Sequence, residues 1–292
     1  MTQHLTYMYL LTPLHTGASV DEGNLMGIAR EVHTEFPYLP ASSLRGKIRA
    51  ELEATHGEEA EAFFGQKIKE GQQPTEGEVW FAEATLLFFP IASLSHHLVW
   101  ITCPLFLERW NRWLQGSPLS HFIAQCRGKI TDQTPALVSF DTNELLLQNA
   151  RLRENSLQHI SVTEIGNNLK QLPSQNGMIS EILNKLVIVS DEDCIALIET
   201  GLQREVKVAL EEGQKTVKGG SFRSEEAIPP ETVLFFPWGM KPAKEKEKQQ
   251  NIRTATEQLL DEKLQFGGLE GLGRGWADLN TVKDDQGGNE NA

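Results

Sequence analysis

A glycine-rich stretch near the end of the chain has the residues best suited to bind a ligand. Residues 264–276 have the sequence LQFGGLEGLGRGW, in which five residues are glycine. Glycine has no Cβ, so such a loop can adopt positive φ and bring backbone N–H groups close to a ligand. Clustered N–H groups bind phosphate oxygens, and the guanidinium of Arg274 adds a planar cation that also pairs with phosphate. Alternatively, the same glycines form a structural turn between closely packed elements.

The surroundings of this loop narrow its possible ligands. A dinucleotide-binding loop needs a strand before it, a helix after it and an acidic residue further on, but too little chain follows Trp276. A Walker loop needs a Gly-Lys-Ser/Thr ending, which this stretch does not have. The pattern therefore disfavours a site for a small nucleotide and leaves open a loop that binds a polynucleotide backbone.

The N-terminal part of the chain carries the other candidate residues. His15 lies in a polar loop at 14–24, after a predicted strand at 5–11, and long loops of this kind are often functional. The next segment, 28–37, carries Arg30 and His33. A metal site at the adjacent pair His96 and His97 is disfavoured, because neighbouring side chains on a strand or helix point in different directions.

A helix is predicted from about residue 41 to Gly57. Its apolar positions, 44, 48 and 52, have helical spacing, and a serine at 42 or 43 offers an N-cap oxygen. The helix also carries Arg45, Lys47 and Arg49, which form either a phosphate-binding face or an ordinary solvated face.

The rest of the chain alternates strands and helices. Strands are predicted at 77–91, 98–104, 145–147, 186–189 and 232–236. Helices are predicted after Pro104, after Ser190 and from 252 to 264, with Trp110 and Trp113 as core or helix-packing residues. Because strands outnumber helices and intermix with them, we expect an α+β fold.

Composition limits the class of protein. The formal net charge of −13 counts against nucleic-acid binding, although phosphate contacts depend on local clusters of cations more than on the total. Three widely separated cysteines argue against a disulfide framework and against a zinc site. The sequence has no long apolar segment and no secretory signal, so we expect a cytoplasmic protein with no membrane partner.

Seven segments, taken in order, resemble the RAMP superfamily of CRISPR proteins, and most of all the backbone subunits of type III-B (Cmr) effector complexes. The segments are LTPLHTG at 11–17, REVHTEFPYLPASSLRGKIR at 30–49, FFG at 63–65, LFFPI at 87–91, WITCP at 100–104, VIVSDED at 187–193 and the glycine loop. Each motif is weak alone, but their ordered combination spans most of the chain.

The resemblance implies a single RAMP domain over 1–292, with a ferredoxin-like, RRM-related core. It implies a thumb β-hairpin inserted at about 203–229, with Lys218, Phe222 and Arg223 as thumb residues, and a disordered acidic tail at about 280–292. Copies would stack along a guide CRISPR RNA and hold the guide–target RNA duplex for antiviral defence, together with the other subunits of the complex. The implied RNA-binding residues, which need no cofactor, are His15, Arg30, His33, Ser43, Arg45, Lys47, Arg49, Gly268, Gly271, Gly273 and Arg274.

The resemblance leaves RNA cleavage open. Family members cut target RNA with an aspartate in the loop after His15 and a divalent metal ion, but that position falls here on Leu25 or Asn24, neither of which is an anionic ligand. Asp21 and Glu22 could replace the aspartate and use Mg²⁺ or Mn²⁺, or they are ordinary solvated acids. A guide-processing RAMP endoribonuclease is the alternative, with His15 and His33 as metal-independent acid–base residues.

Overall fold

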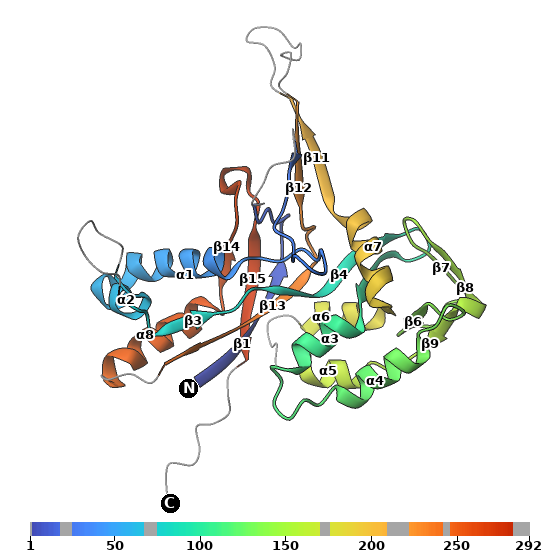
Figure 1. Ribbon diagram of the computed structural model, residues 1–292, viewed down its shortest axis with the longest axis horizontal. Coiled ribbons are helices and arrows are strands. Elements are labelled where there is room, and N and C mark those ends of the chain that lie inside the picture. Colours follow the sequence, from blue (N-terminus) through green and yellow to red (C-terminus); the bar gives the residue numbers. More distant parts are fainter. Residues whose placement is uncertain are drawn as a thin grey trace, which may run out of the picture.

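The structure is a computed structural model that describes residues 2–17, 25–66, 75–169, 176–208, 222–241 and 246–282 (Figure 1). Its helices are α1 (Ala41–His56), α2 (Glu58–Phe64), α3 (Pro104–Asn111), α4 (Ser120–Lys129), α5 (Thr163–Leu169), α6 (Asn176–Asn184), α7 (Asp191–Gly201) and α8 (Lys246–Leu259). The largest sheet contains β1 (Thr2–Leu10), β3 (Val79–Phe81), β4 (Thr85–Ser93), β5 (His97–Thr102), β6 (Ala136–Val138), β9 (Leu157–His159), β10 (Leu186–Val189), β13 (Val233–Met240), β14 (Lys263–Gln265) and β15 (Trp276–Val282).

The centre of this sheet has ferredoxin-like topology. Its strand order is β14-β15-β1-β13-β4-β5-β10-β6-β9, with β3 also paired to β13. The four strands β15, β1, β13 and β4 are antiparallel to their neighbours, and α1 connects β1 to the β3–β4 segment while α8 connects β13 to β14 and β15. Two β-α-β units in this strand order confirm the predicted α+β, ferredoxin-like core.

Both faces of the central strands are buried, because successive side chains of a strand point to opposite faces. Met8, Leu234 and Phe236 pack in the core that includes α1 and α8, whereas Tyr7 and Phe235 pack in a second core with α5 and α6. Figure 1 shows α1, α2 and α8 on the left and α3 to α6 at the lower right. The chain between β4 and β13 therefore adds a lobe on the second face.

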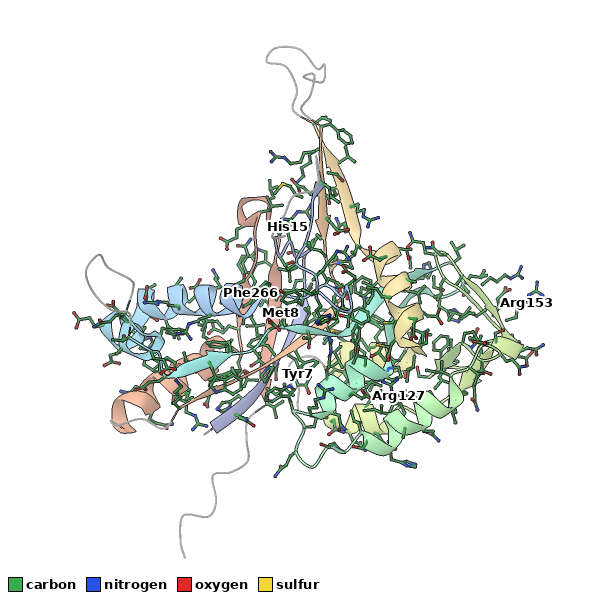
Figure 2. All side chains as sticks on the ribbon, in the orientation of Figure 1. Tyr7, Met8, His15, Arg127, Arg153 and Phe266 are labelled. Carbon is green, nitrogen blue, oxygen red and sulfur yellow. The ribbon has the colours of Figure 1, made fainter. Side chains whose placement is uncertain are left out.

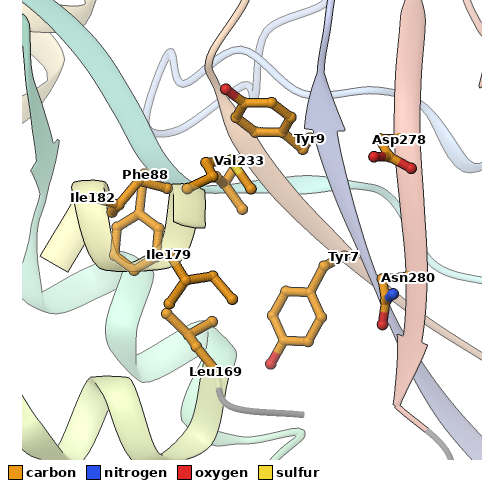
Figure 3. A pocket seen from close by; sticks show the side chains of 10 residues that line it. Tyr7, Tyr9, Phe88, Leu169, Ile179, Ile182, Val233, Asp278 and Asn280 are labelled. Atoms are coloured by element: carbon orange, nitrogen blue, oxygen red, sulfur yellow. The ribbon is translucent and has the colours of Figure 1, made fainter. Parts of the chain in front are cut away.

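The second core is closely packed where α6 lies over the sheet. Figure 3 shows Tyr7 and Tyr9 of β1 facing Ile179 and Ile182 of α6 across a narrow pocket. The pocket has a volume of about 20 Å³, which is room for about one water molecule. Burial raises the pKa of the Tyr7 hydroxyl, which stays protonated and accepts a hydrogen bond from Trp110 Nε1 at 2.8 Å.

Several predicted boundaries were wrong. The strand expected at 77–91 is two strands, β3 and β4, because Ala84 between them pairs instead with Leu39. Ser42 and Ser43 do not cap α1: Pro40 is the N-cap, no side chain caps the helix, and the Ser43 N–H already donates to Pro40 O. The C-cap at Gly57, with φ of 50°, and the N-cap of α7 by Ser190, which accepts from Asp193 N, are confirmed.

The C-terminal expectations also need correction. Helix α8 ends at Leu259 rather than 264, and Leu264 lies in β14, paired with Ala277. Residues 280–282 do not belong to a tail, because β15 pairs with β1 as far as Val282 opposite Leu5. Residues 283–292, which make up the rest of the expected tail, lie outside the described part of the chain.

A second, smaller sheet rises from the body of the molecule (Figure 1). It pairs β11 (Gln203–Lys207) with β12 (Arg223–Ala227) in antiparallel fashion, and β2 (Leu25–Met26) joins β12 in parallel. These strands are the two sides of the hairpin expected at 203–229; Lys218 lies between them, outside the described residues. A short pair, β7 (Glu144–Leu146) and β8 (Arg151–Arg153), completes the strands.

Two further expectations concern cysteines and membranes. Cys103, Cys126 and Cys194 are buried free thiols, in agreement with the expected lack of a disulfide framework. Among the described helices, none is long and apolar enough to cross a bilayer.

Candidate nucleic-acid interface

The glycine loop joins β14 to β15, and two of its glycines are needed for the turn itself. The loop is closed by a hydrogen bond from Phe266 N to Gly275 O at 2.9 Å. Gly275 has φ of +81°, and a Cβ there would lie 1.8 Å from Phe266 O. Gly267 has φ of +80°, and its Cβ would lie 2.3 Å from His15 O. Only glycine fits these two positions without a shift of the backbone.

The outer part of the loop is open. It forms a short 3₁₀ turn at Glu270–Leu272, flanked by Leu269 and Gly273 in the left-handed conformation. Gly271 and Gly273 are exposed, and a Cβ at either position would meet no atom within 4 Å. The predicted structural turn is therefore present at the base of the loop, and ligand binding by the exposed tip stays a prediction.

His15 connects the loop to the small sheet. Its carbonyl accepts a hydrogen bond from Gly268 N at 2.8 Å, and its buried ring places Nδ1 2.8 Å from the carbonyl oxygen of Glu226 in β12. Because a carbonyl only accepts, Nδ1 carries the proton of this hydrogen bond. His33, the other histidine expected at the site, is exposed in the turn between Arg30 and Pro37, which pair with each other.

One face of the small sheet holds Arg30. Its guanidinium pairs with Glu199 of α7 and lies 2.9 Å from Glu226, which is 2% exposed. Arg204 also pairs with Glu226, at 3.0 Å. Burial alone would lower the pKa of Arg30, but the hydrogen bonds and charges of Glu199 and Glu226 outweigh it and raise the pKa. Arg30 is therefore held by carboxylates.

The opposite face of the small sheet holds Arg274. Arg274 Nη2 lies 2.8 Å from Glu205 Oε2 and 3.5 Å from Glu225 Oε2, and Glu225 also pairs with Lys207. The Arg274 side chain is almost fully buried, and its Nη1 is a buried donor with no partner among the described residues. Arg223 lies on this same face, since it pairs with Lys207, and it is exposed. The glycine loop is thus fixed to one side of the hairpin, next to an exposed cation.

The cations of the predicted face on α1 contact other parts of the protein. Arg45 donates to Val79 O at 2.7 Å and to Phe64 O, and Arg49 Nη2 donates to Gly65 O at 3.0 Å. Lys47 pairs with Glu51. Burial and the charge of Arg49 lower the pKa of Arg45. The two arginines therefore hold the chain after α2 against α1, and their contact with RNA, like that of Lys47 and Ser43, stays a prediction.

The expected catalytic positions are only partly described. Asp21, Glu22 and Asn24 lie outside the described residues. Leu25 begins β2, where it pairs with Ser224, and its aliphatic side chain offers no metal ligand. Within the described ranges, no three His, Cys, Asp or Glu side chains come together as a metal site.

Sequence reasoning missed Glu225 and Glu226. Both are buried acids whose partners come from three separate segments of the chain. Their signal in the sequence is weak, because residues 223–227, RSEEA, do not have the composition of a strand. The register of the hairpin decides which residues these acids pair with, and that register is not visible in the sequence.

The chain that carries this arrangement is similar to known proteins over almost its whole length. The model of the RAMP superfamily matches residues 7–278. The chain belongs to the RAMP superfamily. It is 26% identical over 290 residues to the CRISPR system Cmr endoribonuclease Cmr4 of Pyrococcus furiosus, and the match covers 97% of each chain.

Solved RAMP structures share the fold. Oligomeric Cmr4 from Pyrococcus furiosus matches with a TM-score of 0.70 and 23% identity, over 97% of this chain and 98% of that one. A type III-B Cmr-beta complex bound to cognate target RNA contains a chain that matches with a TM-score of 0.73 and 19% identity, over the same shares of both chains. At these identities the structures establish a common fold from end to end.

Proposed function

We propose that this chain is a guide-RNA-binding backbone subunit of a cytoplasmic type III-B CRISPR effector complex. The observation that carries the proposal is that hydrogen bonds and ion pairs join the glycine loop, His15 and the base of the hairpin, three segments far apart in the sequence. Membership of the RAMP superfamily supports it, as do the names of relatives that form Cmr complexes and bind target RNA. The partners are then guide and target RNA, further copies of the chain and the other subunits of the complex.

The surface suits binding without base recognition. The exposed backbone of Gly271 and Gly273 offers little bulk, so an RNA strand can approach closely, and Arg223 and Arg274 lie on the same side of the hairpin. Phosphate and sugar contacts of this type fix the register of an RNA strand and leave its bases free to pair with a target. Arg274 is paired with carboxylates, so the exposed Arg223 is the cation that this side of the hairpin offers to a phosphate.

The proposed role is binding. It assigns no cleavage step to the described residues, because Leu25 supplies neither a base nor a ligand at the position where the family resemblance places an aspartate. His15 and His33, the two histidines expected to act without metal, have different environments. The His15 ring is buried and contacts Glu226 O, whereas His33 is exposed in a turn.

Reversing one exposed charge beside the loop tests the binding proposal. Arg223→Glu is expected to weaken guide-RNA binding about tenfold at moderate salt and to lower the slope of log K against log salt by about one, because a phosphate contact is lost. The measurement is fluorescence anisotropy with labelled guide RNA over a series of salt concentrations. Arg153→Glu is the matched control, since Arg153 is also exposed but lies in β8, far from His15 (Figure 2). Equal losses in both variants would show that total charge, not this surface, binds RNA.

The exposed apolar side chains indicate how copies stack. Of the nine large hydrophobic side chains that are exposed in the described part of the chain, we assign six to two groups by the elements that carry them. A thumb patch contains Val206, Val208 and Phe222, and a loop patch contains Leu11, Leu272 and Trp276. Exposed apolar groups of this kind mark interaction surfaces.

The two patches lie on opposite sides of the hairpin. Val206 alternates with Glu205, and Glu205 faces the glycine loop through Arg274, so Val206 faces away from that loop. Two different patches on opposite sides suit a head-to-tail contact, which repeats along a filament.

Mixing two defective copies tests the head-to-tail contact. Val206→Asp and Leu272→Asp are each expected to abolish cooperative loading of several copies on a long guide RNA, because a charge in an apolar contact is costly. An equal mixture of the two is expected to form pairs and nothing larger, since each copy keeps the patch that the other has lost. Mass photometry counts the copies, and Leu94→Asp, at an exposed leucine in neither patch, is the control. Full filaments from either single variant would contradict this contact.

A further inference from the structure

A second concave site lies away from the RNA interface described above. It is a pocket of about 370 Å³ on the sheet face opposite α1 and α8, with Thr85, Phe235 and Pro237 at its floor. The end of α3 and the residues after it form one wall, and Ala82 and Glu83, between β3 and β4, form the other. This volume falls in the range of about 300–1,000 Å³ typical of small-ligand sites, unlike the narrow pocket of Figure 3.

Two arginines line the pocket, and they differ in what they can still bind. Arg109 is neutralised, since its Nη1 and Nη2 donate to the two carboxylate oxygens of Glu31 at 2.7 and 2.8 Å. Arg112, one turn further on, is exposed and has no ion-pair or hydrogen-bond partner for its side chain within the described ranges. Arg112 is therefore the cation that an incoming anion would meet.

The aromatic wall of the pocket is incompletely covered. Trp110 and Trp113 were expected to be core or helix-packing residues, and Trp110 is in the core, whereas Trp113 is 39% exposed because it follows the end of α3. The Trp113 ring lies 6.2 Å from that of Trp80, whose Nε1 is a buried donor without a partner among the described residues. Trp80 does not line the pocket, so the exposed Trp113 ring is the aromatic surface that the pocket offers to a ligand.

We propose that this pocket binds a nucleotide. The base stacks on Trp113, the phosphate pairs with Arg112, and the Glu83 carboxylate accepts a hydrogen bond from a base amino group or a ribose hydroxyl. The apolar floor at Phe235 and Pro237 excludes water from beneath the base. A free nucleotide and a nucleotide within an RNA strand both carry the base, ribose and phosphate that make these contacts. The site is formed by other elements than the glycine loop and does not depend on the proposed guide interface.

Calorimetry and tryptophan fluorescence on the full chain test the site. The probes are AMP, GMP, CMP and UMP, a five-nucleotide RNA, and inorganic phosphate, each up to about 1 mM, a concentration at which weak binding is measurable. We expect a nucleotide or the short RNA to bind and to quench Trp fluorescence. Trp113→Ala is expected to abolish the quenching, and both Trp113→Ala and Arg112→Ala to weaken binding about tenfold, by loss of one stacking or phosphate contact.

The control lies outside the pocket. Arg153→Ala should leave nucleotide binding unchanged, because Arg153 is exposed in β8 and does not line the pocket. Binding of mononucleotides identifies a free nucleotide as the ligand, whereas binding of the short RNA alone identifies a nucleotide of a strand; both support the pocket. The proposal is overturned if no probe binds, if phosphate binds as well as the nucleotides, or if binding is unchanged in both pocket variants.

Discussion

Gly275→Ala is expected to lower the free energy of unfolding by about 2–5 kcal/mol, because it combines two separate costs. At φ of +81° an L-residue is strained, and the new methyl group would lie 1.8 Å from Phe266 O, which is backbone and cannot rotate away. The hydrogen bond from Phe266 N to Gly275 O and the one from Gly275 N to Pro13 O hold the base of the loop. The same substitution should therefore detach the loop and weaken RNA binding.

Gly271→Ala is the matched control for this prediction. It adds the same methyl group to the same loop, but Gly271 does not have positive φ and no atom lies within 4 Å of the added Cβ. Urea denaturation followed by tryptophan fluorescence measures both variants. If Gly271→Ala proves as destabilising as Gly275→Ala, the cost does not come from the close approach of the backbone at Phe266.

Glu225→Gln is expected to destabilise the protein by about 3–5 kcal/mol, because it leaves a buried cation without one of its charge partners. The Arg274 side chain is 6% exposed and Glu225 4% exposed, so water does little to replace the lost carboxylate, and Arg274 keeps only the partly exposed Glu205. Lys207 loses the same partner but is more exposed. We also expect weaker RNA binding, since Arg274 holds the glycine loop to the hairpin.

Glu205→Gln offers a close comparison, since Glu205 contacts the same Arg274 Nη2 at 2.8 Å. Its side chain is 42% exposed, however, so solvent screens the pair and the expected loss is about 1 kcal/mol or less. Chemical denaturation at neutral pH measures both variants. A loss for Glu205→Gln that matches the loss for Glu225→Gln would mean that burial does not set the strength of these pairs.

The fold could be predicted from local patterns where those patterns are strong. Apolar spacing at Leu44, Ile48 and Leu52 located α1, and all three are buried. The strand order could not be obtained in this way, because pairing of β1 with both β13 and β15 depends on contacts between distant segments. The order was available only through the resemblance to the family.

The site was also predicted only in part, because contacts between distant segments are not visible in the sequence. The glycine loop and His15 were expected together, and the structure joins them through Gly268. Arg45 and Arg49 have the spacing of a cationic face, but spacing cannot show that the carbonyls of Phe64 and Gly65 lie within reach. Trp110 and Trp113 were both expected to be core or helix-packing residues, yet the helix ends between them and Trp113 is partly exposed.

The position of β1 has a consequence for the order of events during synthesis. As the ribosome releases the first strand, both of its neighbours, β13 and β15, are still more than 200 residues from being made. Long-range pairing of this type is slow, and it leaves apolar strand edges open until the partners arrive. His15 and the glycine loop meet only after this closure, so a nascent chain cannot capture RNA at this surface before its last strand is in place.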